Sequence, residues 1–330
     1  MRSRSDPGPA DEVLRRCLEH RVIERCGAPV AIAHIERRPS AASSSYAAEI
    51  VTVGLATGGE LSFFLKDLAT SRITKDHAEQ RRERELAMYR DLLPASELGT
   101  ARFEGCVWDE ANGRFWLLLE LVPGTPVRHC RLEAWVSAAA WLGRLHGFFA
   151  REAERVRTCD LLLRYDAAFL RSRAALAARA VARVSAPLAD QLAPGLERYE
   201  RAIPAMVDWP PTLTHGHYRP YNILVDATAE PTRICPVDWE RAGLGPPLFD
   251  FAYLAEGFDS EHVDLLGAAY RHAAARHGLR VPDPPELRYL ANAFRVQRML
   301  SLLGSAAERG FAEAEVAKLV ALVSGLSQDL

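Results

Sequence analysis

The hydrophobic pattern of the chain changes its period near residue 122, and this change limits the folds that the sequence can adopt. Before it, segments 30–38, 46–56 and 60–68 alternate apolar and polar side chains with the period of two that is typical of strands. The sequence "ATGGE" between the last two segments predicts a hairpin turn. After residue 122, long segments rich in Ala, Leu and Arg repeat apolar residues at helical spacing. We therefore expect an N-terminal part that contains a sheet and a C-terminal part that is mainly helical.

Two helices and two further strands complete the N-terminal part. Apolar residues at helical spacing predict one helix over residues 11–26, ended by Gly27. A second helix is predicted over residues 75–93 and is stopped by a proline. Two strand-like segments, 101–108 and 114–121, flank the turn "DEANG". Together these elements predict a small antiparallel sheet with a helix laid against it.

The C-terminal part follows a linker, "VPGTP", at residues 122–126. Short strand-like pieces interrupt its helices between residues 212 and 238. The segments with helical period are 131–157, 166–184, 187–206, 259–277, 285–304 and 310–328.

The composition excludes several classes of protein. A formal net charge of −2 gives no electrostatic reason to expect nucleic acid or an anionic membrane as a partner. No apolar run approaches the length of a membrane span, and the N-terminus "MRSRSDPGPADE" lacks the apolar core of a signal peptide. The six cysteines lie far apart without a C-x-x-C pair, which argues against a zinc site or a disulfide framework. We expect a cytoplasmic protein with free thiols.

Lysine is rare in this chain, and one lysine ends an apolar strand. Lys66 follows "LSFFL", whereas the only other lysines are Lys75 and Lys318. At the end of a strand the ammonium group can reach a phosphate while the stem of the side chain stays packed, and phosphoryl transfer needs such cations. A solvated lysine just past a strand is the alternative, and it would be favoured if Lys66 stood alone. The motifs further along the chain favour the phosphate role.

Two motifs in the C-terminal part suggest a phosphotransferase. Residues 215–222 are "HGHYRPYN", and "PVDWE" at 236–240 ends a strand-like segment. Lys66, a helix containing glutamates and the apolar segment "WLLLELVPG" at 116–124 precede them. This ordered series resembles the aminoglycoside phosphotransferase and choline kinase group, the small-molecule branch of the protein-kinase-like fold. The resemblance extends over about residues 30–320.

The resemblance implies an α+β chain with a two-lobed, protein-kinase-like fold. Residues 1–121 would form the N-lobe, with the N-terminal helix, a small antiparallel sheet and one key helix. Residues 122–330 would form a larger, mainly helical C-lobe that carries the loop 215–222 and the metal-binding strand end 234–240. The resemblance also implies ATP or GTP as phosphoryl donor and Mg²⁺ as cofactor.

In the N-lobe, the resemblance implies an ion pair at the nucleotide phosphates. Lys66 would hold the α- and β-phosphates and pair with a glutamate of the following helix. Glu85 shares a helical face with Tyr89 and Leu92 and is the first candidate, whereas Glu83 is its rival. The alternative to this pairing is that the glutamate is an exposed acid in a helix that is rich in charges.

Two other segments would contact the nucleotide. Ser44 and Ser45, in the loop "SAASSS", stand where many kinases have glycines over the phosphates, and their hydroxyl and N–H groups could donate hydrogen bonds. An ordinary hairpin loop explains these serines nearly as well. If Leu119 is the gatekeeper, the adenine would bond to backbone groups of Glu120 and Val122. The alternative for this segment is a buried strand followed by a turn.

In the C-lobe, the resemblance implies a metal site and a cation at the transferred phosphate. Asn222 would coordinate Mg²⁺ through its carbonyl oxygen, and Asp238 through its carboxylate, because hard cations prefer oxygen ligands. Glu240 is a weaker candidate for the same metal. Arg219 would steady the γ-phosphate. The alternative for Asp238 is a cap on the turn that follows it.

His217 departs from the family pattern H-G-D-x-x-x-x-N, because it replaces the aspartate that receives the acceptor's hydroxyl proton. A neutral imidazole can take that role, since the reference pKa of histidine is about 6.5. A general base contributes about 10²–10⁴-fold to a rate, less than the metal and the cations contribute to phosphoryl transfer. We expect a kinase with His217 as general base. The alternatives are a pseudokinase that binds nucleotide or a small ligand without phosphoryl transfer and, with little weight, an α-rich scaffold.

The acceptor would be a hydroxylated small molecule, such as an antibiotic, an amino sugar, an amino alcohol or another natural product. The near-neutral charge argues weakly against a polycationic acceptor. The sequence selects neither one of these acceptors nor an oligomeric state. Asp250 would brace the loop 215–222, and His146 is expected to be a packed helix residue. Candidate apolar walls for the acceptor pocket are Trp135, Trp141, Tyr165, Tyr218 and Phe258.

Overall fold

The computed structural model describes residues 9–41, 45–73 and 75–330. Contacts between residues divide the chain into two compact units. The N-unit comprises Met1–Ala95 and Gly99–Pro123, and the C-unit comprises Ser96–Leu98 and Gly124–Leu330. The change between the units at Pro123 and Gly124 lies beside the boundary expected between residues 121 and 122.

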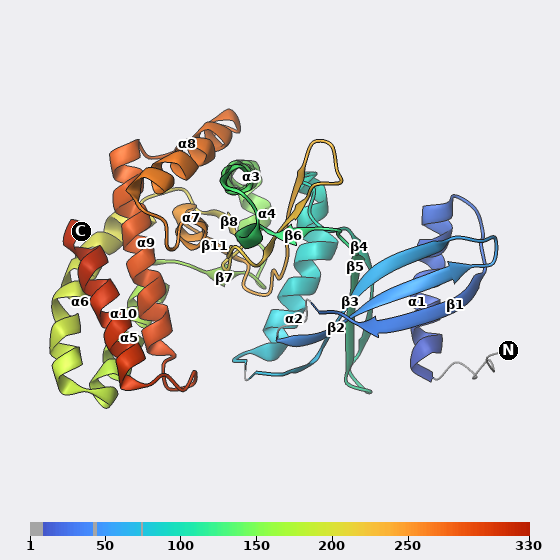
Figure 1. Ribbon diagram of the computed structural model, residues 1–330, viewed down its shortest axis with the longest axis horizontal. Helices are drawn as coiled ribbons and strands as arrows, with labels where there is room; N and C mark the ends of the chain where they lie inside the picture. The colour runs from blue at the N-terminus through green and yellow to red at the C-terminus, as the bar shows by residue number, and fades with distance from the viewer. Residues whose placement is uncertain (1–8, 42–44, 74) are drawn as a thin grey trace. The chain divides into compact units, whose positions relative to one another are not determined.

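The N-unit contains an antiparallel sheet of five strands in the order β1-β2-β3-β5-β4 (Figure 1). The strands are β1 (Ile32–Pro39), β2 (Tyr46–Leu55), β3 (Glu60–Ser71), β4 (Phe103–Asp109) and β5 (Arg114–Glu120). These are the five strands that the alternating segments predicted. β3 continues beyond the expected end at residue 68.

Helix α1 (Pro9–Cys26) packs its apolar side on one face of this sheet. Leu14, Leu18 and Val22 of α1 are fully buried. Their cluster includes the strand residues Val51, Val53, Phe63, Leu65, Trp116 and Leu118. Burial of each such aliphatic side chain stabilises the fold by about 1.5–3 kcal/mol.

The second predicted helix is shorter than expected as an α-helix. α2 covers Ala78–Ala87, continues in a π-helical turn over Met88–Leu92 and ends in a 3₁₀ turn over Leu93–Ser96. The proline expected to stop the helix, Pro94, lies inside this last turn. Proline has no N–H to donate to an α-helical bond, which explains the change of helix type before the chain leaves the helix.

The C-unit is mainly helical, as the sequence predicted. Its helices are α3 (Leu132–Arg151), α4 (Ala153–Arg157), α5 (Ala167–Val184), α6 (Ala186–Val207), α7 (Leu248–Leu254), α8 (Ser260–Arg276), α9 (Pro284–Gly304) and α10 (Glu313–Leu326). The single helix expected over residues 131–157 is therefore two helices that meet at Glu152. Short 3₁₀ turns cover Val127–His129 and Ser327–Asp329.

Two small sheets lie among these helices. One has the order β10-β9-β6, with β6 (Thr125–Pro126), β9 (Ile223–Asp226) and β10 (Arg233–Pro236). The other has the order β7-β11-β8, with β7 (Leu163–Arg164), β8 (Thr212–Thr214) and β11 (Gly243–Gly245). The loop 215–222 connects β8 to β9, so each sheet fixes one end of it.

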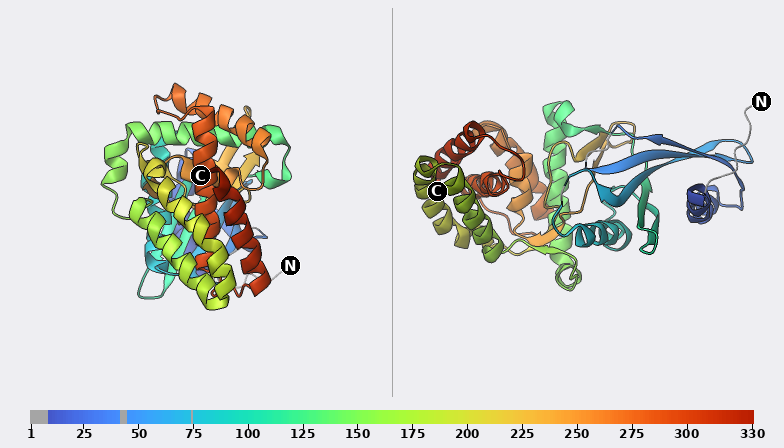
Figure 2. Two further views of the ribbon diagram at one scale, coloured as in Figure 1. Left: turned by 90° about the vertical axis from the view of Figure 1, so that its left-hand side faces the viewer. Right: turned by 90° about the horizontal axis from the view of Figure 1, so that it is seen from below.

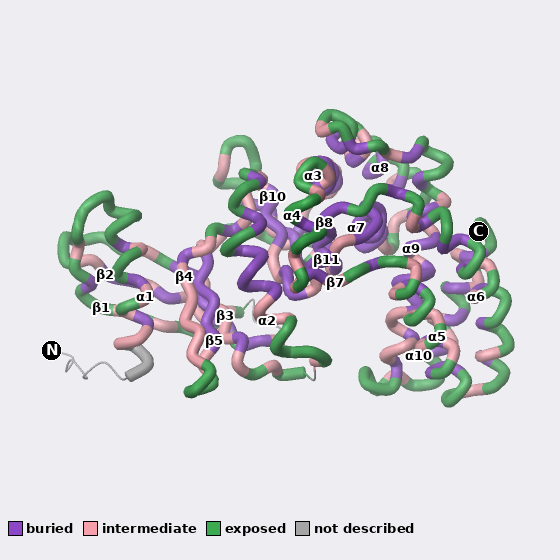
Figure 3. Tube along the Cα trace, turned by 180° about the vertical axis from the view of Figure 1, so that it is seen from behind, coloured by how far each residue is buried: buried purple, intermediate pink, exposed green. Residues whose placement is uncertain are grey.

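The core of the C-unit surrounds α7 and the inner side of α9. All seven residues of α7 are buried, which Figure 3 shows as an unbroken purple helix. Helices α5, α6, α9 and α10 pack side by side (Figure 2). α3 packs closely on α8, where a Cβ on Gly143 would stand 2.4 Å from the carbonyl oxygen of Tyr270. The absence of a side chain at Gly143 therefore allows the close approach of these two helices.

All six cysteines lie in described residues, and none forms a disulfide bond. They are Cys17, Cys26, Cys106, Cys130, Cys159 and Cys235. Among the described residues, no helix combines the length and the apolar character needed to cross a membrane.

Candidate active site

Lys66 and Glu85 form a buried ion pair within the N-unit. Lys66 Nζ lies 2.7 and 2.8 Å from the two carboxylate oxygens of Glu85. The side chains are 13% and 1% exposed, so little water screens their attraction. Neighbouring strand residues point to opposite faces of a sheet, so Lys66 faces away from the cluster that holds Leu65. Of the two glutamates considered from the sequence, Glu85 is the one that contacts the ammonium group.

An aromatic ring lies beside this ion pair. Lys66 Nζ stands 5.4 Å from the centroid of the Tyr46 ring, and Lys75 Nζ stands 3.9 Å from the same centroid. The Tyr46 ring is buried at the start of β2. Two of the three lysines of the chain are therefore gathered around one ring of the N-unit.

The other expected nucleotide contacts of the N-unit are placed only in part. Ser44 lies outside the described residues. The carbonyl oxygen of Ser45 accepts the Arg72 N–H at 2.7 Å. The Glu120 N–H donates to the carbonyl oxygen of Arg102 at 2.9 Å, so this N–H is already used within the sheet. Val122 follows β5 in a segment without regular structure and is half-buried.

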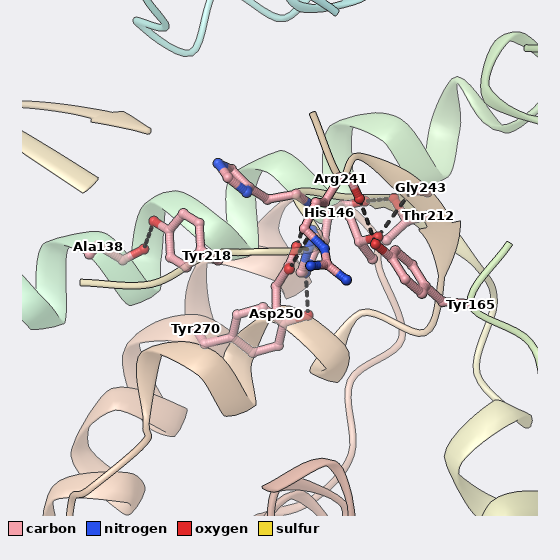
Figure 4. A network of polar contacts seen from close by, with 12 residues as sticks. Ala138, His146, Tyr165, Thr212, Tyr218, Arg241, Gly243, Asp250 and Tyr270 are labelled. Atoms are coloured by element: carbon pink, nitrogen blue, oxygen red, sulfur yellow. Dashed lines mark hydrogen bonds and ion pairs between the residues drawn. The ribbon is translucent and has the colours of Figure 1, made fainter. Parts of the chain in front are cut away.

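In the C-unit, a buried carboxylate holds the start of the loop 215–222. Asp250 Oδ2 accepts the His215 N–H at 2.5 Å, and Oδ1 accepts the Gly216 N–H at 2.9 Å. His146 Nε2 lies 3.5 Å from Asp250 Oδ2, and His146 Nδ1 lies 3.1 Å from the Tyr270 hydroxyl group. Figure 4 shows Asp250 beside His146 and Tyr270. Both Asp250 and His146 are fully buried, so His146 is a packed helix residue.

Gly216 occupies a position that no other residue can take without a shift of the backbone. Its φ is +74°, and a Cβ would stand 2.0 Å from the carbonyl oxygen of Arg241. The Tyr165 hydroxyl group donates to that same oxygen at 2.6 Å. The glycine in the motif is therefore required by the close packing of two loops.

His217 is half-buried and contacts two residues of its own loop. Its Nε2 lies 3.2 Å from the Tyr221 hydroxyl oxygen, and its Nδ1 lies 3.3 Å from Asn222 Nδ2. Burial lowers the pKa of the imidazole well below its ordinary value of 6.5. The positive charge of Arg241 lowers the pKa further, while Asp238 opposes the shift. The imidazole is therefore neutral at neutral pH.

The rest of the loop forms tight turns that fix the positions of Arg219 and Asn222. The Arg219 N–H donates to the His217 carbonyl oxygen at 2.7 Å, and the Asn222 N–H donates to the Arg219 carbonyl oxygen at 2.8 Å. Arg219 Nη1 donates to the Tyr221 hydroxyl oxygen at 3.0 Å, and its Nη2 lies 3.4 Å from Glu256 Oε2. The guanidinium group of Arg219 is thus directed toward Tyr221 and Glu256.

The side chains of Asn222, Asp238 and Glu240 are the candidates for holding a hard divalent cation. The Val237 N–H donates to the backbone carbonyl oxygen of Asn222 at 2.8 Å. This hydrogen bond ties the loop to the segment that carries Asp238. Asp238 has a φ of +71°, a conformation that is unusual for a residue other than glycine and is often retained for function. Carboxylate oxygens of Asp238 and Glu240 lie within 4.8 Å of each other. Two carboxylates and an amide form the donor set that Mg²⁺ prefers.

Three of the five aromatic residues expected to line the acceptor pocket belong to the core instead. Trp141, Tyr165 and Tyr218 are at most 1% exposed. The Trp141 Nε1–H and the Tyr218 hydroxyl group donate to backbone carbonyl oxygens, at 2.7 and 2.9 Å. Their hydrogen bonds let these rings pack inside the unit. Trp135 and Phe258 remain half-buried, with ring centroids 4.9 Å apart.

Four side chains around Arg219 were not predicted from the sequence. They come from the loop itself, from α7 and its end, and from α9, and only the loop residue had a nearby motif. Because the others lie on separate elements, only the packing of α7 on α9 brings them together. They are Tyr221, Tyr253, Glu256 and Arg298.

Comparisons with known proteins place the chain in a family. A model of the phosphotransferase enzyme family (APH) matches residues 41–290. The search of curated proteins returned no match. A microcompartment-associated aminopropanol kinase has a TM-score of 0.63 at 17% identity, over 89% of this chain and 90% of that chain. A macrolide 2′-phosphotransferase from Brachybacterium faecium has a TM-score of 0.57 at 18% identity, over 92% and 96% of the two chains.

A third solved structure, the GDP complex of wild-type aminoglycoside 2′-phosphotransferase-IIIa, has a TM-score of 0.61 at 14% identity, over 94% of this chain and 97% of that chain. At these identities the likeness shows the fold, and it confirms the α+β, kinase-like class expected from the sequence. The family model spans well over half of the residues, which confirms the resemblance drawn from the motifs. This chain belongs to the phosphotransferase enzyme family.

Proposed function

We propose that this protein transfers the γ-phosphoryl group of ATP or GTP to a hydroxyl group of a small molecule. The observation that carries the proposal is the construction of the loop 215–222. Asp250 fixes its first two N–H groups, and one hydrogen bond joins Asn222 to the segment of Asp238. A loop held in this way presents His217 and Asn222 in a fixed geometry and stays joined to the segment of Asp238, as the positioning needed for phosphoryl transfer requires.

The proposal gives each of these groups a role. Asn222 and Asp238 would hold Mg²⁺, with Glu240 as a further ligand, and this ion would neutralise the negative charge of the phosphates. Lys66, oriented by Glu85, binds the nucleotide phosphates, and Arg219 binds the group being transferred. The oxygen of the acceptor hydroxyl forms a bond to the γ-phosphorus, the bond to the leaving nucleoside diphosphate breaks, and the hydroxyl proton is released.

The proposal assigns that proton to His217 Nε2. Acceptance at Nε2 requires the tautomer whose proton is on Nδ1. Asn222 Nδ2 stands 3.1 Å from the His217 carbonyl oxygen and 3.3 Å from Nδ1. In this tautomer the side-chain amide of Asn222 donates to the backbone carbonyl oxygen of His217. If the amide donated to Nδ1 instead, it would favour the tautomer whose proton is on Nε2. In a loose transition state the proton leaves late, so a modest base is sufficient.

The acceptor belongs to the hydroxylated natural products, amino alcohols or sugars. The solved relatives are named as kinases of aminopropanol and as phosphotransferases of macrolides and aminoglycosides, which makes these compounds the first to try. If the acceptor is a macrolide or an aminoglycoside, the activity would be the modification of an antibiotic. We place the protein in the cytoplasm, where cysteines that form no disulfide bond would stay reduced.

The test is nucleotide turnover with a panel of these compounds. ADP or GDP formation is followed for the full chain and for His217→Ala, with His272→Ala, an exposed histidine of α8, as the matched control. Loss of about 10²–10⁴-fold in His217→Ala alone supports the base role. Undiminished turnover in His217→Ala contradicts it. Nucleotide binding without turnover in the unmodified protein would support the pseudokinase instead.

A further inference from the structure

Two arginines of the C-unit pair with Glu256, and a third, Arg295, lies one turn before Arg298 on α9. Arg219 Nη2 lies 3.4 Å from Glu256 Oε2, and Arg298 Nε lies 3.7 Å from the same oxygen. Arg295 is near enough for Glu256 to raise its pKa against the effect of burial, and its Nη2 donates to the Phe258 carbonyl oxygen at 3.3 Å. Three positive charges face one negative charge, so this group, which we call the Glu256 cluster, has an excess of positive charge.

Arg298 is the most unusual member of the cluster. It is 8% exposed, and its buried Nε makes no hydrogen bond among the residues that the structure describes, since the Glu256 carboxylate oxygen stands 3.7 Å away. Its guanidinium carbon lies 5.2 Å from the centroid of the Tyr253 ring. A buried charged donor without an acceptor is costly, and such groups in native proteins commonly bind a ligand or an ion.

The Glu256 cluster lies beside His217. The rings of His217 and Tyr253 have centroids 5.9 Å apart, and the Arg219 guanidinium carbon lies 6.0 Å from the Tyr253 centroid. Tyr221 connects the same groups, since its hydroxyl oxygen contacts both Arg219 Nη1 and His217 Nε2, at 3.0 and 3.2 Å. A molecule whose hydroxyl group reaches His217 Nε2 would therefore have its other groups near the cluster.

We propose that the acceptor carries a carboxylate, which Arg298 and Arg295 bind while its hydroxyl group faces His217. The inference rests on the proposed function and names its substrate class. A guanidinium group matches a carboxylate with two parallel hydrogen bonds and is readily used in buried sites. A cationic amine would meet the excess positive charge, and the one acid of the cluster is already shared by arginines. The acceptor is thus a hydroxy acid rather than an amino alcohol or an amino sugar.

Three sugars with the same ring test this charge preference. Glucuronate carries a negative charge, glucose is neutral, and protonated glucosamine carries a positive charge. The probe is the Nε–H resonance of Arg295 and of Arg298 in the full chain, assigned with Arg295→Gln and Arg298→Gln. We expect glucuronate alone to shift both resonances, with an affinity at least about tenfold above those of the other two sugars.

Variants of the cluster sharpen the test. Arg295→Gln, at a half-buried position that tolerates the change better than Arg298, should weaken glucuronate binding about tenfold or more. Glu256→Gln should strengthen it, because a competing carboxylate becomes neutral. Arg288→Gln, on the same helix but paired with Asp264, is the matched control and should change nothing.

Other outcomes overturn the inference. Equal shifts by glucose or glucosamine, or no shift by any of the three sugars, contradict a carboxylate site. A loss of ATP affinity in Arg295→Gln without a loss of glucuronate affinity assigns the cluster to a nucleotide phosphate instead. An ATP titration of the same sample separates the two proposals: nucleotide binding without glucuronate binding rejects the inference alone, and absence of ATP and GTP binding rejects the proposed function.

Discussion

Asp250 holds the backbone of His215 through a hydrogen bond of 2.5 Å to its N–H, and the other carboxylate oxygen holds the next N–H of the chain. Both donors are buried, so removal of the carboxylate leaves them without a partner. We expect Asp250→Ala to lower the free energy of unfolding by about 3–5 kcal/mol. Urea denaturation measures this loss. Asp259→Ala, which removes an exposed helix cap, is the control, and an equal loss in both variants would contradict the role of Asp250.

Two glycines with nearly the same backbone conformation, Gly216 and Gly278, distinguish the cost of a steric contact from the cost of conformational strain. Gly216 and Gly278 have φ values of +74° and +76°, but a Cβ on Gly278 would meet nothing within 4 Å. Gly278→Ala should cost only the strain of the left-handed conformation, about 1–2 kcal/mol. Gly216→Ala should cost clearly more, because the new Cβ meets the Arg241 carbonyl oxygen. Thermal unfolding of both variants checks this, and equal shifts in Tm would reject the close contact.

Variants of the ion pair between Lys66 and Glu85 should affect the stability of the protein and its activity differently. Lys66→Met leaves a buried carboxylate without its partner and should destabilise the protein by about 3 kcal/mol or more. Lys66→Met combined with Glu85→Leu should recover much of that stability, since two apolar side chains replace the pair. The double variant should still lack turnover, because the ammonium group assigned to the nucleotide phosphates is gone. Lys318→Met, on α10, is the control for the loss of a lysine.

A double variant that is both stable and active would show that the pair is structural only. Chemical denaturation and ADP formation, measured on the same samples, distinguish the two roles.

The pKa of His217 determines how the rate depends on pH. The neutral imidazole is the form that accepts a proton, so activity is lost as the pH falls through the pKa of the folded protein. For an unperturbed histidine this loss would fall near pH 6.5, its reference pKa. Burial and Arg241 lower the pKa well below 6.5, so the rate should stay constant down to and below that pH. A pH–rate profile with its midpoint at pH 6.5 or above would contradict this account.

Short-range patterns predicted most of the fold. The alternating segments gave the five strands of the N-unit sheet, and the helical period gave the long helices of the C-unit. The break between α3 and α4 and the π-helical turn after α2 were missed, because local backbone changes within a helical segment leave its apolar period almost unchanged. The pairs that form β7, β8 and β11 were also missed, since they join short segments far apart in the chain.

The candidate site was predictable where it lies in one short motif. His217, Arg219 and Asn222 are neighbours in the sequence, and the role expected for Asp250 as a brace agrees with its hydrogen bonds. The Glu256 cluster was not predictable, because its arginines on α9 reach Glu256 only through the tertiary packing of that helix. Trp141 and Tyr218 were misjudged for the same reason, since nothing local distinguishes an aromatic residue of a pocket from one of the core.

Calorimetric titration of ATP with and without Mg²⁺, on the unmodified protein and on Asp238→Ala, tests the phosphotransferase account most directly, because it needs no knowledge of the acceptor. Asp208→Ala, an exposed acid after α6, is the control. The account predicts that Mg²⁺ strengthens ATP binding and that Asp238→Ala removes most of this gain while Asp208→Ala keeps it. Absence of binding for both ATP and GTP, or a Mg²⁺ effect that persists without Asp238, would contradict it.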